Sequence, residues 1–161
     1  MGFFKADPPP PLPALRRADL AEAVSRIPDR NGGCGAGWVG PELQYLDEQL
    51  QQNESVVAVA TLAISGRESI GVLALTERRI FSALGGRDNR RRPLGGRPAV
   101  EVIEIADIDH ISGHPYIKAY MQTSIMKTNG DRISVLIGPT VDHGTSFISA
   151  VEEAVHKAKF R

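Results

Sequence analysis

Short apolar runs follow one another from residue 55 onward, separated by clusters of charged residues, Gly and Asn. Runs of this length, rich in Val, Ile and Leu and bounded by turn residues, predict β-strands. The clearest pair lies on either side of Glu77-Arg78 and predicts an antiparallel hairpin. The predicted strands are 56–64, 70–76, 79–84, 100–105, an apolar thread through 108 and 111, 116–128 and 132–137.

The last two strands form a hairpin about Asn129-Gly130, and its register can be argued from the sequence. A two-residue turn would oppose Ile125 with Ser134, which mixes apolar and polar faces. A three-residue loop with Gly130 in the left-handed conformation opposes Ile125 with Ile133 instead. Because a one-residue slip turns a strand's whole apolar set to the other face, we prefer the second register. It also opposes Thr123 with Val135 and Met121 with Ile137.

The carboxy-terminal pattern changes to the period of a helix. Apolar residues share one face and charged residues lie largely opposite, so the helix is amphipathic and needs a sheet to cover. We expect Asp142 or Thr145 to cap its start. The apolar face is Phe147, Ile148, Val151, Ala154, Val155 and Ala158.

The amino-terminal third has a different character. Residues 1–13 end in a proline run, which predicts an extended leader, either a stiff spacer or a PxxP ligand. Residues 14–27 and 41–53 predict two short amphipathic helices joined by a Gly-rich link. That link is too long for a helix-turn-helix DNA reader. We therefore expect a leader (1–13), a helical arm (14–53) that packs on the sheet or on a second copy, and a β domain (54–161).

Three segments resemble successive parts of bacterial pleckstrin-homology-like domains. They are Glu54-Ser55-Val56-Val57, the hairpin Gly71-Val72-Leu73-Ala74-Leu75-Thr76-Glu77-Arg78-Arg79-Ile80-Phe81, and Ile105-Ala106-Asp107-Ile108-Asp109-His110-Ile111. The resemblance covers about residues 50–160 and leaves the arm unmatched. It implies a mainly β fold, an antiparallel barrel or sandwich of about seven strands capped by the carboxy-terminal helix. It also implies a scaffold for interaction rather than catalysis, and fold alone names no ligand.

Composition narrows the function classes. The chain of 161 residues carries 19 Lys and Arg against 19 Asp and Glu, so its net charge is zero. A protein that coats nucleic acid needs many phosphate contacts, which this balance disfavours. The single cysteine, Cys34, excludes an intramolecular disulfide. The start of the chain shows no secretory signal and the longest apolar run is too short to span a bilayer, so we expect a soluble cytoplasmic protein.

Motifs for cofactor, metal or catalytic chemistry are weak. The sequence Gly35-Ala36-Gly37-Trp38-Val39-Gly40 matches G-x-G-x-x-G, but no strand precedes it, so it reads as a coincidence in the Gly-rich link. Cys34 and the four histidines show no spacing of a catalytic pair or a metal site. An enzyme using His110 or His114 with Asp107 or Asp109 is retained as an alternative. We predict no enzyme, no cofactor and no metal.

The strongest candidate site is an arginine-rich loop, predicted over residues 85–98. Guanidinium groups bind phosphate and carboxylate in bidentate fashion, so the loop could bind an acidic protein, anionic lipid headgroups or RNA. The equal alternative is a solvated insertion, or a loop that pairs with the acidic segment 99–113 of its own or a neighbouring copy. The candidate binding residues are Arg87, Arg90, Arg91, Arg92 and Arg97, with Arg78 and Arg79 added.

Partners follow from the same residues. We expect a protein partner or self-association first, then anionic lipid. Nucleic acid ranks below these, because single-strand binders stack bases on aromatic side chains and none lies near the arginines in the sequence. Trp38 and Tyr45 in the arm are candidate interface residues, with packing on the domain as the alternative.

Overall fold

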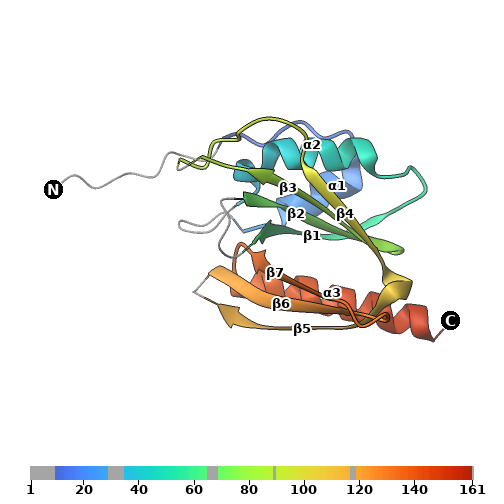
Figure 1. The fold of residues 1–161 in the computed structure, drawn as a ribbon. Helices are drawn as coiled ribbons and strands as arrows, with labels where there is room; N and C mark the ends of the chain where they lie inside the picture. The colour runs from blue at the N-terminus through green and yellow to red at the C-terminus, as the bar shows by residue number, and fades with distance from the viewer. Residues whose placement is uncertain (1–9, 29–34, 65–68, 89, 117–118, 161) are drawn as a thin grey trace.

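The structure is a computed structural model and describes residues 10–28, 35–64, 69–88, 90–116 and 119–160. Two helices and a short 3-10 turn come first, seven strands follow, and a long helix ends the described chain (Figure 1). The bounds are α1 Ala18–Ser25, η1 Ala36–Val39, α2 Gly40–Gln49, β1 Val56–Ala63, β2 Ser69–Thr76, β3 Arg79–Gly86, β4 Ala99–Glu104, η2 Ile105–Asp107, β5 Ile108–Tyr116, β6 Tyr120–Lys127, β7 Arg132–Gly138 and α3 Val141–Lys159.

All seven strands belong to one antiparallel sheet in the order β4-β3-β2-β1-β7-β6-β5. Its two halves meet where β1 pairs with β7, over only Thr61–Ala63. The edge strands β4 and β5 do not pair with each other, so the sheet folds over without closing into a barrel. Figure 1 shows β1–β4 in one layer and β5–β7 in the other, with α3 beside the second. The expected seven strands, their antiparallel pairing and the carboxy-terminal helix are confirmed.

The central strands β1, β2 and β3 are covered on both faces. One face joins α3 and β5–β7 in the main core, to which Ala60, Leu62 and Leu75 belong. The other face, with Val59, Val72 and Phe81, lies under the arm. Burial on both faces explains why these strands read as continuous apolar runs rather than as alternating ones. The two cores thus share one set of strands.

The arm packs on the sheet, which decides between the two alternatives drawn from the sequence. Helices α1 and α2 lie over the outer face of β1–β3 (Figure 1). The buried apolar residues of the arm in this core are Leu20, Ala23, Val24, Ile27, Val39, Leu43, Leu46 and Leu50. Each large apolar side chain buried this way contributes about 1.5–3 kcal/mol. The arm is therefore an integral layer of the fold.

The arm helices are shorter than predicted. We expected a helix from residue 14, yet α1 begins at Ala18. The backbone N–H groups of Arg16 and Arg17 donate to the Asp47 carboxylate of α2, at 2.7 and 3.1 Å. Those bonds to a second helix hold the preceding residues in an extended segment. Likewise α2 ends at Gln49 rather than at residue 53.

The register of the β6–β7 hairpin is as predicted. Ile125 faces Ile133, Thr123 faces Val135 and Met121 faces Ile137. Gly130 has φ +92°, the left-handed conformation that the three-residue loop requires. The first strand of this hairpin is shorter than we predicted, because β5 ends at Tyr116 and β6 begins at Tyr120. The single strand predicted over 116–128 therefore corresponds to the last residue of β5 and to β6.

The start of α3 differs from the prediction. The helix begins at Val141, and Thr140 caps it by accepting a bond from the His143 N–H at 3.0 Å. We expected Asp142 or Thr145 to cap its start. Gly144 is needed in this first turn because a Cβ there would lie 2.7 Å from the Ile137 carbonyl oxygen. The glycine lets the first turn of the helix approach β7 closely.

Candidate interaction surfaces

The arginine-rich loop is fixed to the arm by a buried ion pair. Arg87, which is 4% exposed, bonds to both carboxylate oxygens of Glu42, which is 2% exposed. Its Nη2 also donates to the Trp38 carbonyl at 2.9 Å. The predicted binding residue Arg87 is thus engaged inside the fold, where it joins the end of β3 to α2. Glu42 was not singled out from the sequence, where its one signal is its charge on the otherwise apolar face of a short helix.

The next turn of the loop is organised by Asp88. Its carboxylate accepts bonds from the N–H groups of Arg90 and Arg92, at 2.8 and 2.9 Å, and from Arg92 Nε at 2.9 Å. These bonds, the Arg92 backbone bond foremost, hold the pKa of Asp88 below its usual value. Arg91 occupies the left-handed region at φ +64°. The turn therefore presents consecutive arginines outward from a defined backbone.

Four arginines of the loop remain at the surface. Arg90, Arg91, Arg92 and Arg97 are exposed. Arg92 pairs with Asp88, whereas no carboxylate among the described residues pairs with the other three. The side chains of Arg90, Arg91 and Arg97 are available to an anionic ligand because no described carboxylate is paired with them. We call Arg90, Arg91, Arg92 and Arg97 the loop arginines.

Trp38 lies beside the loop arginines. The Arg91 guanidinium carbon is 5.6 Å from the centre of the indole ring, the distance of a cation–π contact. Both line a surface groove of about 370 Å³. The groove is bordered further by Pro10, Pro11, Pro13, Gly37, Gly40, Pro41, Gln44, Arg92 and Pro93. An aromatic side chain therefore adjoins the arginines in space, although none lies near them in the sequence. Tyr45 is half-buried on α2.

Arg78 and Arg79 lie away from the loop. They precede and begin β3, whose eight residues separate them from Arg87 by about 25 Å of extended strand. Arg79 binds the buried Glu54 carboxylate through Nε at 2.6 Å and Nη2 at 3.0 Å. It also lies over the Phe81 ring, at 5.2 Å from its centre. The fold does not bring this pair together with the loop arginines.

The Glu54 site ties the first hairpin to the segment before β1. Thr76 Oγ1 donates to the carboxylate at 3.1 Å, beside the two bonds from Arg79. Burial alone would raise the pKa of Glu54, but the Arg79 ion pair and the Thr76 bond hold it below its ordinary value. The carboxylate is therefore charged in the folded protein at neutral pH.

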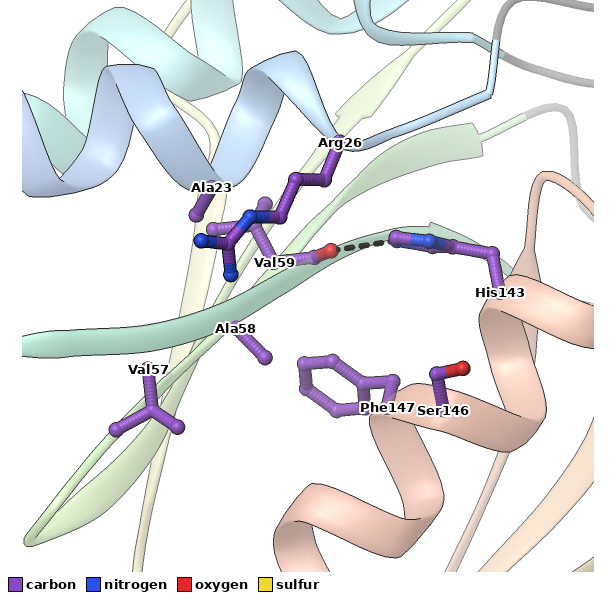
Figure 2. Close-up of a pocket in the computed structure, with 8 residues that line it drawn as sticks. All are labelled: Ala23, Arg26, Val57, Ala58, Val59, His143, Ser146 and Phe147. Atoms are coloured by element: carbon purple, nitrogen blue, oxygen red, sulfur yellow. Dashed lines mark hydrogen bonds between the residues drawn. The ribbon is translucent and has the colours of Figure 1, made fainter.

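A second depression lies between α1, β1 and α3. It encloses about 250 Å³ and is lined by Ala23, Arg26, Val57, Ala58, Val59, His143, Ser146 and Phe147 (Figure 2). The His143 Nε2 lies 2.8 Å from the Val59 carbonyl oxygen, so this nitrogen carries the proton and donates (Figure 2). His143 supplies the one imidazole that lines the depression, and its Nε2 is bonded to backbone. The residues that line the depression therefore include no pair of groups suited to acid–base chemistry.

The residues of the enzyme alternative lie on the surface. His110 Nδ1 is 2.8 Å from Asp109 Oδ2, and both side chains are more than half exposed. The pKa of Asp109 is lowered by this bond and by Lys159. Among the described residues no group of three or more His, Cys, Asp or Glu side chains could hold a metal ion. Cys34 lies outside the described residues.

No helix in the described part of the chain has the length and apolarity needed to cross a membrane.

Comparison with known proteins gives distant likenesses. No family model matches the chain. It is 28% identical over 123 residues to the doublesex- and mab-3-related transcription factor A2 of Oreochromis niloticus, covering 71% of this chain and 27% of that protein. The protein of the same name from Xiphophorus maculatus is 26% identical over 148 residues, covering 86% and 32%. The chain spans less than a third of the length of these relatives.

Solved structures with a similar course of the chain are more distant in sequence. The C-terminal domain of an unknown protein from Leishmania infantum has a TM-score of 0.43 at 13% identity, covering 64% of this chain and 85% of that one. The linker-DH/PH domains of p115-RhoGEF give 0.45 at 13%, covering 86% and 38%. The DH/PH domains of PDZ-RhoGEF, solved in complex with activated RhoA, give 0.45 at 12%, covering 86% and 39%.

Proposed function

We propose that this protein is a non-catalytic interaction module that binds an acidic segment of a partner protein through the loop arginines and Trp38. One observation carries the proposal. Arg90, Arg91 and Arg97 are exposed without a carboxylate partner among the described residues, on a loop that Arg87 and Glu42 fix in place. A loop held by buried contacts loses less conformational freedom on binding than an unattached one, which favours affinity.

Charge and shape together favour an acidic peptide over a purely ionic contact. Guanidinium groups bind carboxylates in bidentate fashion, and the groove beside Trp38 gives apolar side chains a place to bind. Trp and Arg are the residues most enriched at energetically dominant interface positions. An acidic segment with an apolar or proline residue next to its carboxylates fits this combination.

The test compares two variants with the same loss of charge. The first replaces Arg90, Arg91 and Arg92 by Ala; the control replaces the exposed Arg16, Arg26 and Arg132 by Ala. Binding of a fluorescent Glu-rich peptide is measured for both by anisotropy, alongside flotation on vesicles of phosphatidylcholine with phosphatidylserine. The proposal expects peptide binding that is lost only in the loop variant. Equal binding by both variants, or binding to vesicles alone, would reject it.

A second candidate function rests on the position of Trp38. Single-strand binders combine cationic side chains with aromatic rings on which bases stack, and the fold places Trp38 against Arg91. From the sequence we ranked this function below the others, because no aromatic residue is near the loop in the chain. The candidate predicts that a thymidine oligonucleotide binds at low salt, that the affinity falls steeply with added salt, and that Trp38→Ala weakens binding. Absence of binding at low salt would exclude it.

A further inference from the structure

The strand β4 forms one free edge of the sheet. It is last in the strand order, and its burial pattern is exposed at every position except Ile103. Because alternate residues of a strand point their N–H and C=O groups to the same side, half of those of β4 face away from β3. Such an edge is a template for another strand.

The two edges of the sheet are not alike. On β5, the Asp109 carbonyl accepts a bond from Lys159 Nζ at 2.7 Å, and Pro115 removes a donor from the strand. On β4, Val100 and Val102 are 36% and 43% exposed. Val100 pairs with Ala83 and Val102 with Phe81 on the neighbouring strand β3. Both valines therefore extend, to the edge of the sheet, the apolar face that the arm covers over β1–β3. An apolar, β-branched edge of this kind favours addition of a strand.

The charges around β4 identify the occupant. The loop arginines, Arg97 closest, precede the strand, whereas Glu104 and Asp107 stand at its end. In an antiparallel pair of two identical strands, the start of each lies beside the end of the other. A second copy would therefore place Arg97 next to acidic residues at both ends of the contact, with no change to the sheet.

Symmetry restricts the register. A two-fold axis that relates two antiparallel edge strands is perpendicular to the sheet. Each residue therefore faces a residue of the second copy whose side chain lies on the same face of the sheet. The residue on the axis faces its own counterpart in the second copy. Centring on Glu101 would oppose two carboxylates, which is unfavourable. Centring on Val102 opposes the two Val102 side chains and sets Val100 against the second copy's Glu104. It also directs Arg97, just before the strand, toward the second copy's Asp107 on η2, just after it.

We infer that the protein forms a two-fold symmetric dimer by antiparallel pairing of β4 with β4 of a second copy, centred on Val102, with Arg97 paired to Asp107 across the contact. The inference shares Arg97 with the proposed function, but the other residues of the peptide site, Arg90, Arg91, Arg92 and Trp38, take no part in the dimer contact. The variant lacking Arg90, Arg91 and Arg92 should keep the dimer, so failure of one proposal is distinguishable from failure of the other.

The first test is sedimentation velocity of the full chain over a range of concentrations. We expect a monomer–dimer equilibrium for wild type. Arg97→Asp and Asp107→Arg should each shift this equilibrium to monomer. The two changes together should restore the dimer. A far-UV circular dichroism melt of each variant shows that loss of the dimer is not loss of the fold. A wild-type monomer at every concentration would overturn the inference, as would a double variant no better than the singles.

The second test fixes the register. In a Cys34→Ser background, Val102→Cys places two thiols opposite each other, at the roughly 4.5–5.5 Å Cα separation of facing antiparallel residues, which a disulfide spans. With diamide as the oxidant that takes up the two hydrogens, it should form a covalent dimer. The matched Val100→Cys, which faces Glu104, should not. Crosslinking through Val100→Cys alone, or through neither, would contradict the assigned register.

Discussion

Arg87 and Glu42 form a buried ion pair that joins the end of β3 to helix α2. Their side chains are 4% and 3% exposed, and the Trp38 carbonyl accepts a further bond from the same guanidinium. The pair connects three parts of the molecule: the sheet, the arm and the start of the arginine-rich loop. It explains why one arginine of a basic cluster is enclosed by the fold while its neighbours face solvent.

Removing one member of this pair should destabilise the protein strongly. Arg87→Met leaves the Glu42 carboxylate buried without its counter-ion, which costs about 3–5 kcal/mol. The free energy of unfolding, measured by urea denaturation, should fall by that amount. The double change Glu42→Leu with Arg87→Met should cost less than Arg87→Met alone, because it removes both charges.

The matched control is Arg92→Met, whose ion pair with Asp88 is exposed at the arginine. Exposed pairs contribute about 0–1 kcal/mol, so this change should be mild. If Arg87→Met proves as mild as Arg92→Met, the buried pair does not hold the loop as described.

The arm should unfold together with the sheet. Leu43 on α2 is fully buried against β1–β3, so Leu43→Ala should cost about 2–5 kcal/mol. Leu94→Ala, at a side chain 69% exposed, should change stability by less than about 0.5 kcal/mol. Trp38 emission reports on the arm and far-UV circular dichroism on the whole fold. Two separate transitions by these probes would show instead that the arm melts on its own.

Gly144→Ala should destabilise the protein although alanine is the better helix former. In an exposed helix this change is favourable by roughly 0.5–1 kcal/mol. Here the added Cβ would lie 2.7 Å from the Ile137 carbonyl oxygen and 2.9 Å from Met121 Cγ. Thermal denaturation should show a lower midpoint than that of wild type. A raised midpoint would mean that α3 does not approach β7 this closely.

Stability should fall in acid partly through Glu54. Its pKa is lowered in the folded protein, so its contribution is complete above the ordinary value of 4.5 and is lost as the pH falls through the lower folded value. Urea denaturation at a series of pH values from 7 down to 3 should show wild type losing stability below about pH 4.5. Glu54→Gln should be less stable at pH 7 and show a shallower acid loss. Identical slopes for Glu54→Gln and wild type would contradict the assignment, and the exposed Glu48→Gln serves as the control.

Much of the β-sheet could be predicted from sequence because its signals are local. The Asn129-Gly130 loop and the apolar positions of β6 and β7 determine the register without help from distant residues. Likewise, Glu77-Arg78 is enough to indicate the first hairpin. The predicted cap of α3 was wrong, because Thr140 accepts the bond from the His143 N–H. The close approach of Gly144 to β7 is a tertiary contact that local preference cannot reveal.

The interaction surface could be predicted only in part. Composition identifies the arginine cluster, but the division between buried Arg87 and exposed Arg90 or Arg91 depends on Glu42, 45 residues away in sequence. The contact of Trp38 with Arg91 is also long-range, so the sequence shows no aromatic side chain beside the arginines, and nucleic acid ranked below the other partners on that ground. A charged residue at an otherwise apolar helix face, such as Glu42, is the one signal that could have suggested a buried partner.

Trp38 is the single tryptophan of the chain, so its fluorescence observes the proposed binding surface directly. The most direct measurement is the emission of Trp38 while a Glu-rich peptide is titrated into wild type, into the variant lacking Arg90, Arg91 and Arg92, and into the control lacking Arg16, Arg26 and Arg132. The account predicts a saturable change in wild type and control that the loop variant loses. An unchanged emission in wild type, or the same saturable change in the loop variant, would contradict it.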